Sequence, residues 1–273
     1  MSNGFILTED GWIVTIIDIS RNFKKESIAV VRGLNVYPVE KIIVDPYSNA
    51  VFIKISAKDL PAVKLGSPDN SSIGQNILAV SFASGIIPTN IKNIDWRLSQ
   101  ETTQFVESTE KLSEFLLTKD EFDKYFSGAV AVNLDGDVIG MILNQKDDKK
   151  VNTIISSNIL QQAIEGILQN EKIARPVLGI KYIDLSRAVG LKNQKITLEK
   201  GIMVWETPFP PTPAGMAGIR VKDIITHIDG SSISGIKSFS SIIQEYSIGD
   251  KAIFTILRDT KEIKIEVVLG KIT

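Results

Sequence analysis

The serine, histidine and acidic side chains decide which chemistry this chain could perform. The sequence contains a single histidine, His227, and no cysteine, which excludes a thiolate nucleophile and a disulfide. A zinc or iron site would have to consist mostly of carboxylates, which suit calcium or magnesium better. A calcium site from Asp18, Asp45 and Asp69 is conceivable, but no ligand spacing supports it. A serine oxygen attacks a carbonyl carbon only when a neighbouring base takes its proton.

Strands dominate the elements that could position such groups. Residues 1–90 consist of short β-branched runs separated by turn residues, and this spacing predicts antiparallel β-barrels rather than βαβ units. Residues 128–143 predict a further hairpin, because Asp135 and Gly136 supply a tight turn between two apolar runs. The predicted fold class is therefore mainly β.

A helix at 156–172 is predicted to close a first domain. It would be capped by Ser157 or Asn158, and its apolar face would consist of Leu160, Ala163, Ile164, Ile167 and Leu168. A new series of strands begins at Arg175, so we expect one domain over residues 1–172 and a second over 173–273. The second is predicted to be β-rich with one main helix, whose apolar stripe is formed by Phe239, Ile242, Ile243 and Tyr246.

The amino-acid composition argues against some classes of binding partner. With 43% apolar residues, 23% charged residues and a formal net charge of -1, the chain has no bulk basic charge to attract nucleic acid or an anionic membrane. The longest apolar run is far too short for a transmembrane helix. Residues 101–126 are polar and acidic, which favours a solvated surface excursion over a substrate loop. The chain begins abruptly in a strand pattern, so we expect that an upstream segment has been removed.

Five sequence blocks occur in the order known from one protease family. NGFILTEDGWIVT, LPAVKLGSPDNSSIGQNILAVSF and SGAVAVNLDGDVIGM in the first domain, with RPVLGI and TPAGMAGIRVKDIITHIDG in the second, resemble blocks of the HtrA (Deg) proteases. The resemblance covers essentially the full chain. It implies a trypsin-like double β-barrel over residues 1–172, followed by a PDZ domain over residues 173–273.

The resemblance also locates the positions of a catalytic triad, in which serine attacks, histidine takes the proton and aspartate orients the imidazole. Asp18 stands where the family has its histidine, and a carboxylate is too weak a base to activate a serine hydroxyl. Asn49 stands where the family has its aspartate, and a neutral amide would not stabilise an imidazolium. Ser127 occupies the position of the nucleophile.

The residues around Ser127 also depart from the family pattern. Tyr125 replaces the glycine whose backbone N–H contributes to the oxyanion hole, and Ala129 and Val130 replace a glycine and a proline. A non-glycine residue at 125 disfavours the positive φ that such a hole often needs, and one donor there is worth roughly 3–4 kcal/mol. We therefore expect no catalytic residue at the degenerate positions Asp18, Asn49, Ser127 and Tyr125.

Other interpretations of these residues are open. Ser127 could be a relic nucleophile with Lys124 or Lys119 as its base, since serine–lysine dyads exist, or a small residue that fits a tight turn. Asp18 and Asn49 could form a structural hydrogen-bonded pair. His227 lies in a strand pattern of the second domain, so we expect a half-buried strand residue rather than a base that reaches Ser127.

The PDZ resemblance implies a peptide site that needs no special side chain. In such domains the backbone N–H groups of one loop hold a terminal carboxylate, and the peptide adds a strand beside the loop. Residues 177–180 match this loop, and the predicted peptide-binding residues are Val177, Leu178, Gly179, Ile180, Phe239, Ile242 and Ile243. The alternative is that the apolar members of this set simply form the domain core.

Together these residues predict an HtrA-like pseudoprotease without metal or cofactor. It would bind extended peptides or the C-termini of unfolded proteins, as a scaffold, regulator or chaperone-like partner in protein quality control. The competing hypotheses are a weak serine endopeptidase that uses Ser127 with a non-histidine base, and a structural subunit that joins an active HtrA-type homologue. The resemblance implies an extracytoplasmic location, in the periplasm or cell envelope.

Overall fold

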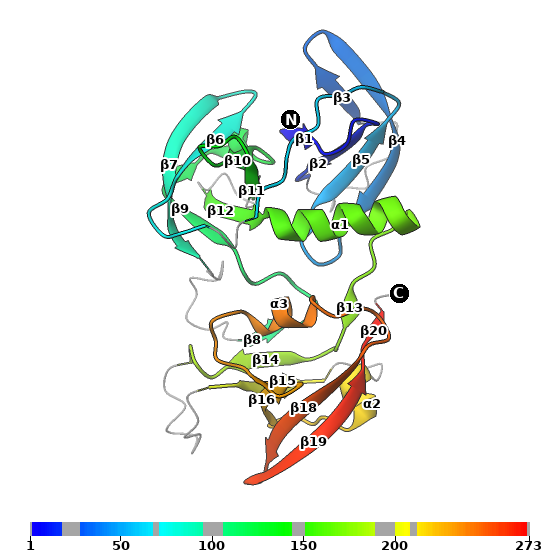
Figure 1. Ribbon diagram of the computed structural model, residues 1–273, viewed down its shortest axis with the longest axis vertical. Helices are drawn as coiled ribbons and strands as arrows, with labels where there is room; N and C mark the ends of the chain where they lie inside the picture. Colours follow the sequence, from blue (N-terminus) through cyan, green and yellow to red (C-terminus); the bar gives the residue numbers. More distant parts are fainter. Residues whose placement is uncertain are drawn as a thin grey trace. The chain divides into compact units, whose positions relative to one another are not determined.

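The computed structural model describes residues 2–17, 28–67, 71–94, 106–143, 151–188, 200–207 and 212–271. The chain forms two compact units, which Figure 1 shows in ribbon form. The first comprises Met1–Trp96 and Phe115–Ile173, and the second comprises Arg97–Glu114 and Ala174–Thr273. The second unit thus includes a segment from the middle of the chain, which lies before the predicted boundary near residue 172.

The first unit begins with a five-stranded antiparallel sheet in the order β1-β2-β5-β4-β3. Its strands are β1 (Gly4–Ile6), β2 (Trp12–Thr15), β3 (Ala29–Arg32), β4 (Asn35–Val44) and β5 (Val51–Ile55). The β-branched residues of these runs favour extended backbone and pack on one another in the sheet core. That core consists of Ile13, Val39, Val51, Ile53, Ile55 and Leu60.

The second part of this unit is a closed barrel in the order β10-β11-β12-β9-β7-β6. The strands are β6 (Asn76–Ser81), β7 (Gly85–Ile94), β9 (Leu116–Phe122), β10 (Val130–Val132), β11 (Val138–Ile142) and β12 (Val151–Ser156). The predicted hairpin is confirmed as β10 and β11. Its turn needs Gly136 at φ +85°, and the side chain of Asn133 accepts hydrogen bonds from the N–H groups of Asp135 and Asp137.

Helix α1 (Ser157–Asn170) packs against β11 and β12. Four of the predicted apolar residues, Leu160, Ala163, Ile164 and Ile167, are buried, whereas Leu168 is 56% exposed. The predicted cap was wrong by one or two residues, because Ser156 is the N-cap. Ser157 is instead buried inside the helix, where its hydroxyl donates to the carbonyl of Gly66 at 2.7 Å.

The second unit is built on a sheet in the order β19-β18-β16-β15-β14-β8, with β17 paired to β16, and on a two-stranded sheet β13-β20. The strands are β8 (Val106–Ser108), β13 (Pro176–Val177), β14 (Lys181–Asp184), β15 (Ile202–Glu206), β16 (Ile224–Ile228), β17 (Ser231–Ser232), β18 (Lys251–Arg258), β19 (Lys261–Val268) and β20 (Gly270–Lys271). Its described residues also form two short helices, α2 (Pro213–Ala217) and α3 (Phe239–Ile243).

Helix α3 is shorter than its apolar stripe predicts, since it ends at Ile243. Phe239 and Ile243 are nonetheless buried in the core of the unit, and Ile242 and Tyr246 pack against it. Ser238 caps the helix by accepting from the N–H of Ser241 at 3.1 Å. The stripe therefore predicted the buried face correctly and the helix length incorrectly.

The interpretation of residues 101–126 as a solvated excursion was wrong where the structure describes them. Val106–Ser108 form β8, and Leu116–Phe122 form β9 of the closed barrel. Phe115, Leu116, Leu117 and Phe122 are all buried. The acidic composition concealed this, because strand residues alternate between two faces and only one face needs to be apolar.

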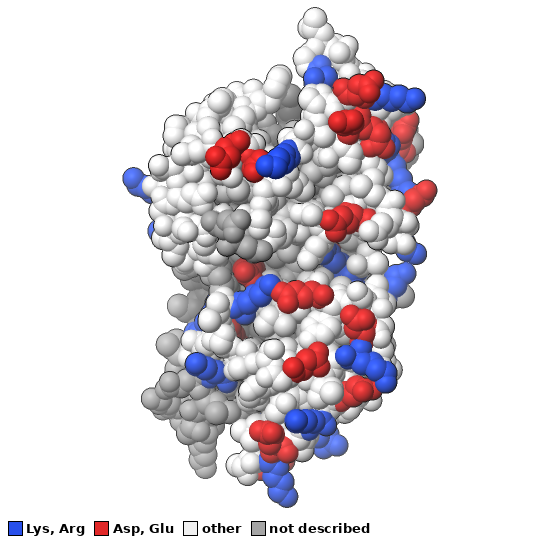
Figure 2. All heavy atoms as spheres, in the orientation of Figure 1, with Lys and Arg blue, Asp and Glu red and all other residues white. Residues whose placement is uncertain are grey.

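Charges are mixed on the surface, and acidic and basic side chains lie interspersed on the face that Figure 2 shows. One ion pair of the second unit is largely buried. Arg258 donates to both carboxylate oxygens of Asp223 at 2.8 Å, and Asp223 is buried. No helix in the described part of the chain has the length and apolar character to cross a membrane.

Candidate functional site

Ser127 follows a 3-10 turn, η3 (Lys124–Phe126), and leads into β10. It is only 4% exposed. Its carbonyl oxygen accepts from the backbone N–H of Asn3 at 2.8 Å, from the Asn3 side-chain amide at 3.0 Å and from the Ser2 hydroxyl at 3.0 Å. The Ser127 Oγ lies 3.4 Å from the Ser2 Oγ. Ser2 and Asn3 therefore hold the backbone of Ser127, and Ser2 also lies next to its hydroxyl.

The backbone N–H groups near Ser127 are engaged within the turn. Tyr125 N–H donates to the Asp123 side chain at 2.9 Å, and Ser127 N–H donates to the Lys124 carbonyl at 3.2 Å. An oxyanion hole requires such donors to point at the oxygen on which charge develops. In this arrangement both N–H groups already have acceptors, while the Tyr125 side chain is 56% exposed.

Asn49 lies in the turn between β4 and β5. It is exposed, adopts a left-handed conformation at φ 60°, and donates its N–H to the Asp45 carbonyl at 2.8 Å. Asparagine tolerates this conformation better than most residues, so the turn itself accounts for its presence. The Asp45 carboxylate is buried and accepts from the Ser48 hydroxyl at 2.6 Å and from Tyr47 N–H at 3.2 Å.

Asp18 and Asp69 lie outside the residues that the structure describes. The pairing of Asp18 with Asn49, and the calcium set that includes Asp45, therefore stay predictions. Among the residues with described positions, no three histidine, aspartate or glutamate side chains gather as metal ligands would.

His227 and Lys124 are two further residues that the sequence offered as a base for Ser127. His227 is a half-buried residue of β16, as predicted, and its Nδ1 lies 3.0 Å from the Thr226 hydroxyl oxygen within the second unit. The Lys124 ammonium lies 5.9 Å from the ring centroid of Tyr125.

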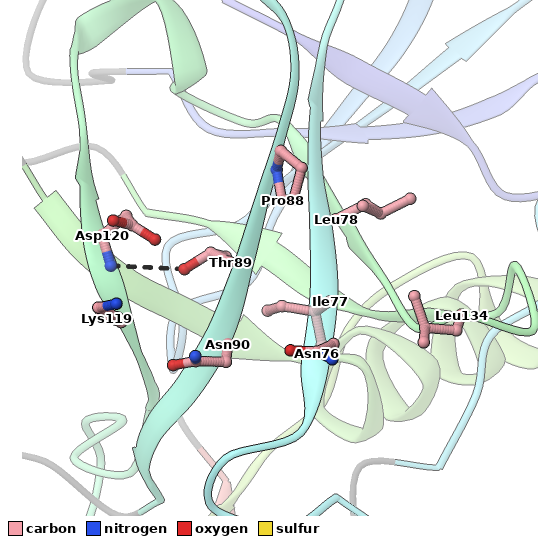
Figure 3. Close-up of a pocket in the computed structure, with 9 residues that line it drawn as sticks. All are labelled: Asn76, Ile77, Leu78, Pro88, Thr89, Asn90, Lys119, Asp120 and Leu134. Atoms are coloured by element: carbon pink, nitrogen blue, oxygen red, sulfur yellow. Dashed lines mark hydrogen bonds between the residues drawn. The ribbon is translucent and has the colours of Figure 1, made fainter.

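Lys119 borders an open hollow on the barrel, which Figure 3 shows between β6, β7 and β9. Asp120 also borders it and donates its backbone N–H to the Thr89 hydroxyl oxygen at 3.4 Å. Neither Ser127 nor Asn49 is among the residues that line the hollow, which are Asn76, Ile77, Leu78, Pro88, Thr89, Asn90, Lys119, Asp120 and Leu134.

The predicted carboxylate loop, residues 177–180, connects β13 to β14. Gly179 has φ +78°, and a Cβ atom there would overlap the side chain of Thr212, with only 2.5 Å to its Cγ2. A glycine is therefore required at this position. The Gly179 N–H donates to a carboxylate oxygen of Glu110 at 2.8 Å, and the Ile180 N–H donates to the Thr109 hydroxyl oxygen at 3.2 Å.

The apolar residues predicted to line the peptide site lie together. Leu178, Ile180, Phe239 and Ile243 belong to the core cluster of the second unit, and Ile242 packs against it. Val177 is half-buried in β13 and pairs with Gly270. Sequence reasoning missed Thr109 and Glu110, the two partners of the loop. Their only signal is a short run with β-branched residues, Val106 to Thr109, inside an acidic stretch.

Two domain families match the chain: a trypsin-like peptidase domain over residues 2–141 and a PDZ domain over residues 176–269. A probable periplasmic serine endoprotease DegP-like from Marinomonas sp. (strain MWYL1) is 26% identical, with 98% of this chain and 56% of the relative covered. The periplasmic serine endoprotease DegP of Escherichia coli (strain K12) is 24% identical over the same shares. The chain thus spans about half the length of these curated relatives.

The fold has a counterpart among solved structures. The HtrA-type protease AlgW, solved with a decapeptide, matches at a TM-score of 0.74 and 19% identity, over 99% of this chain and 82% of that one. This likeness confirms the predicted fold, trypsin-like barrels with a PDZ domain. Because the trypsin-like match alone covers just over half of the sequence, the chain belongs to the HtrA/Deg family of trypsin-like peptidases with a PDZ domain.

Proposed function

We propose that this chain is a pseudoprotease of the HtrA family that binds peptides through its PDZ domain. One contrast between two sets of backbone N–H groups carries the proposal. The N–H groups of Tyr125 and Ser127 donate to acceptors inside their own turn. The N–H of Gly179 instead donates to the side-chain carboxylate of Glu110 at 2.8 Å. This contrast supports a loop that binds an anionic chain end and a turn that does not stabilise an oxyanion.

The missing base supports the same proposal. The only histidine of the chain, His227, is a strand residue of the second unit. Loss of the triad histidine lowers kcat by roughly a factor of 10⁶ in a serine protease, and loss of one oxyanion-hole donor lowers it by a further factor of about 10² to 10³. Burial of Ser127 to 4% exposure adds an obstacle to substrate access.

Labelling with a fluorophosphonate tests the loss of chemistry. The folded chain, the Ser127→Ala variant and an active trypsin are treated in parallel, and the bound reagent is measured by intact mass. We expect full labelling of trypsin and none of the folded chain. An adduct on Ser127, together with peptide hydrolysis that Ser127→Ala abolishes, would show that the chain is a serine hydrolase with a non-histidine base.

Binding of C-terminal peptides tests the other half of the proposal. A library of fluorescent peptides with free carboxylates is titrated with the full chain, and every hit is remade with an amidated end. Because the loop at 177–180 recognises negative charge through N–H groups, amidation should abolish binding. Equal binding of acid and amide forms would contradict a carboxylate loop.

The cellular role follows from this binding. We propose that the protein acts outside the cytoplasm, as a scaffold, regulator or chaperone-like partner that recognises exposed C-termini in protein quality control. The names of its relatives, which are periplasmic endoproteases, support this location. Fractionation of the native cells would test it, and recovery of the protein in the cytoplasm would contradict it.

A further inference from the structure

The sheet edge at which a peptide would add already carries a strand of the same chain. β8 pairs with β14 in antiparallel register, with Val106 opposite Ile183 and Ser108 opposite Lys181. β8 is the terminal strand of the sheet beyond β14, and Figure 1 shows it beside β14 and near α3. Since β-strand addition needs the unpaired backbone groups of an edge strand, β14 has no free edge while β8 is bound.

The segment continues from β8 into the carboxylate loop, as the end of a peptide would. Thr109 N–H donates to the Ile180 carbonyl at 3.2 Å, and the Thr109 hydroxyl oxygen accepts from Ile180 N–H at 3.2 Å. One residue later, the Glu110 carboxylate accepts from Gly179 N–H at 2.8 Å. Two successive N–H groups of the loop thus have oxygen acceptors from this segment, in the place of a terminal carboxylate.

The segment also contacts helix α3. Tyr182, on β14, donates its hydroxyl to Glu107 at 2.7 Å and accepts from the N–H of Ser240 in α3 at 3.2 Å. Burial, and then the charge and hydrogen bond of Glu107, raise the pKa of Tyr182, so its hydroxyl remains a donor at neutral pH. The Ser113 hydroxyl lies 2.9 Å from that of Ser240. Residues 106–113 therefore contact both β14 and α3.

We propose that residues 106–110 are an internal ligand of the PDZ domain, and that a C-terminal peptide binds only by displacing them. This inference rests on the proposed function and adds its regulation: the groove is closed by default. Residue 110 is followed after a few residues by β9 of the first unit, so the segment is tethered at both ends. A short tether gives an effective concentration on the order of millimolar, so an internal segment with an intrinsic Kd of about 100 μM would weaken the binding of any competing peptide roughly tenfold.

Glu110→Ala tests the inference, with Glu121→Ala as the matched control. The first removes the carboxylate that the loop holds, and the second removes an equal charge from an exposed residue eleven positions later. The ligand is a fluorescent copy of residues 105–110, FVESTE, with a free carboxylate, titrated against the full chain in each form. Hydrogen exchange of residues 106–109 is measured in parallel, which also shows whether each variant is folded.

We expect FVESTE to bind Glu110→Ala about tenfold more tightly than the wild type or Glu121→Ala, and exchange at 106–109 to be slow in the wild type and faster in Glu110→Ala. Equal affinity for all three forms, with library peptides still binding through their carboxylates, would overturn the internal ligand and leave the proposed function intact. If neither FVESTE nor any library peptide bound any form, the peptide site itself would be refuted and the internal ligand with it.

Discussion

Replacing Gly179 by alanine should destabilise the second unit and disable its carboxylate loop. An alanine at φ +78° is in the left-handed region, which costs about 1–2 kcal/mol, and its Cβ would overlap the side chain of Thr212. Overpacking of this kind typically adds about 1–3 kcal/mol. The expected loss in the free energy of unfolding is therefore about 2–5 kcal/mol. The N–H of residue 179 should also turn away from the Glu110 carboxylate.

Gly215→Ala is the matched control. Gly215 lies in α2, where an added Cβ would be 3.5 Å from the Thr212 Oγ1 and φ is not positive. Because alanine favours helix over glycine, this variant should gain about 0.5–1 kcal/mol. The same chemical change thus has opposite predicted signs at two positions beside one threonine.

The measurement is urea denaturation of the full chain, read by hydrogen exchange in peptides that cover β14 and β15. These peptides report on the second unit without interference from the first. Equal stability of Gly179→Ala and the wild type would refute the claim that the loop demands a glycine. A loss of stability in Gly215→Ala as large as in Gly179→Ala would show that the packing around Thr212, rather than the loop conformation, sets the effect.

Three further outcomes can be measured by the same denaturation or by NMR titration. Leu160→Ala should lower the stability of the first unit by about 2–5 kcal/mol because it leaves a cavity under α1, whereas Leu168→Ala, at an exposed position, should change it by less than about 0.5 kcal/mol. Arg258→Met should cost about 3–5 kcal/mol, since it leaves a buried aspartate without its ion-pair partner; an unchanged stability would contradict this. The hydrogen bond from Lys54 lowers the pKa of Asp10, so its small contribution to stability is present above the unfolded-state pKa and is lost as the pH falls through the folded-state pKa; Lys54→Met should raise that pKa.

Local patterns in the sequence predicted much of the fold. The β-branched runs indicated the strands, and Asp135 with Gly136 indicated the hairpin of β10 and β11. The buried face of α1 followed from its 3.6-residue period. Each of these features depends on residues close together in the chain, so a short stretch of sequence contains the physical cause. Some errors concerned element ends, such as Ser156 as the cap of α1, where single hydrogen bonds decide the boundary. A larger error concerned residues 101–126, whose acidic composition gave no signal of β8 and β9.

The sequence by itself determined which side chains this protein can use: no cysteine, one histidine far from Ser127 in the chain, and a glycine in the loop at 177–180. Only the tertiary structure decided what surrounds them. Contacts between residues about 70 or more positions apart include the pairing of β8 with β14, the hydrogen bond from Gly179 N–H to the Glu110 carboxylate, and the hydrogen bonds of Ser2 and Asn3 to the Ser127 carbonyl. Such contacts depend on how distant segments pack, and no local pattern of polar residues specifies their partner.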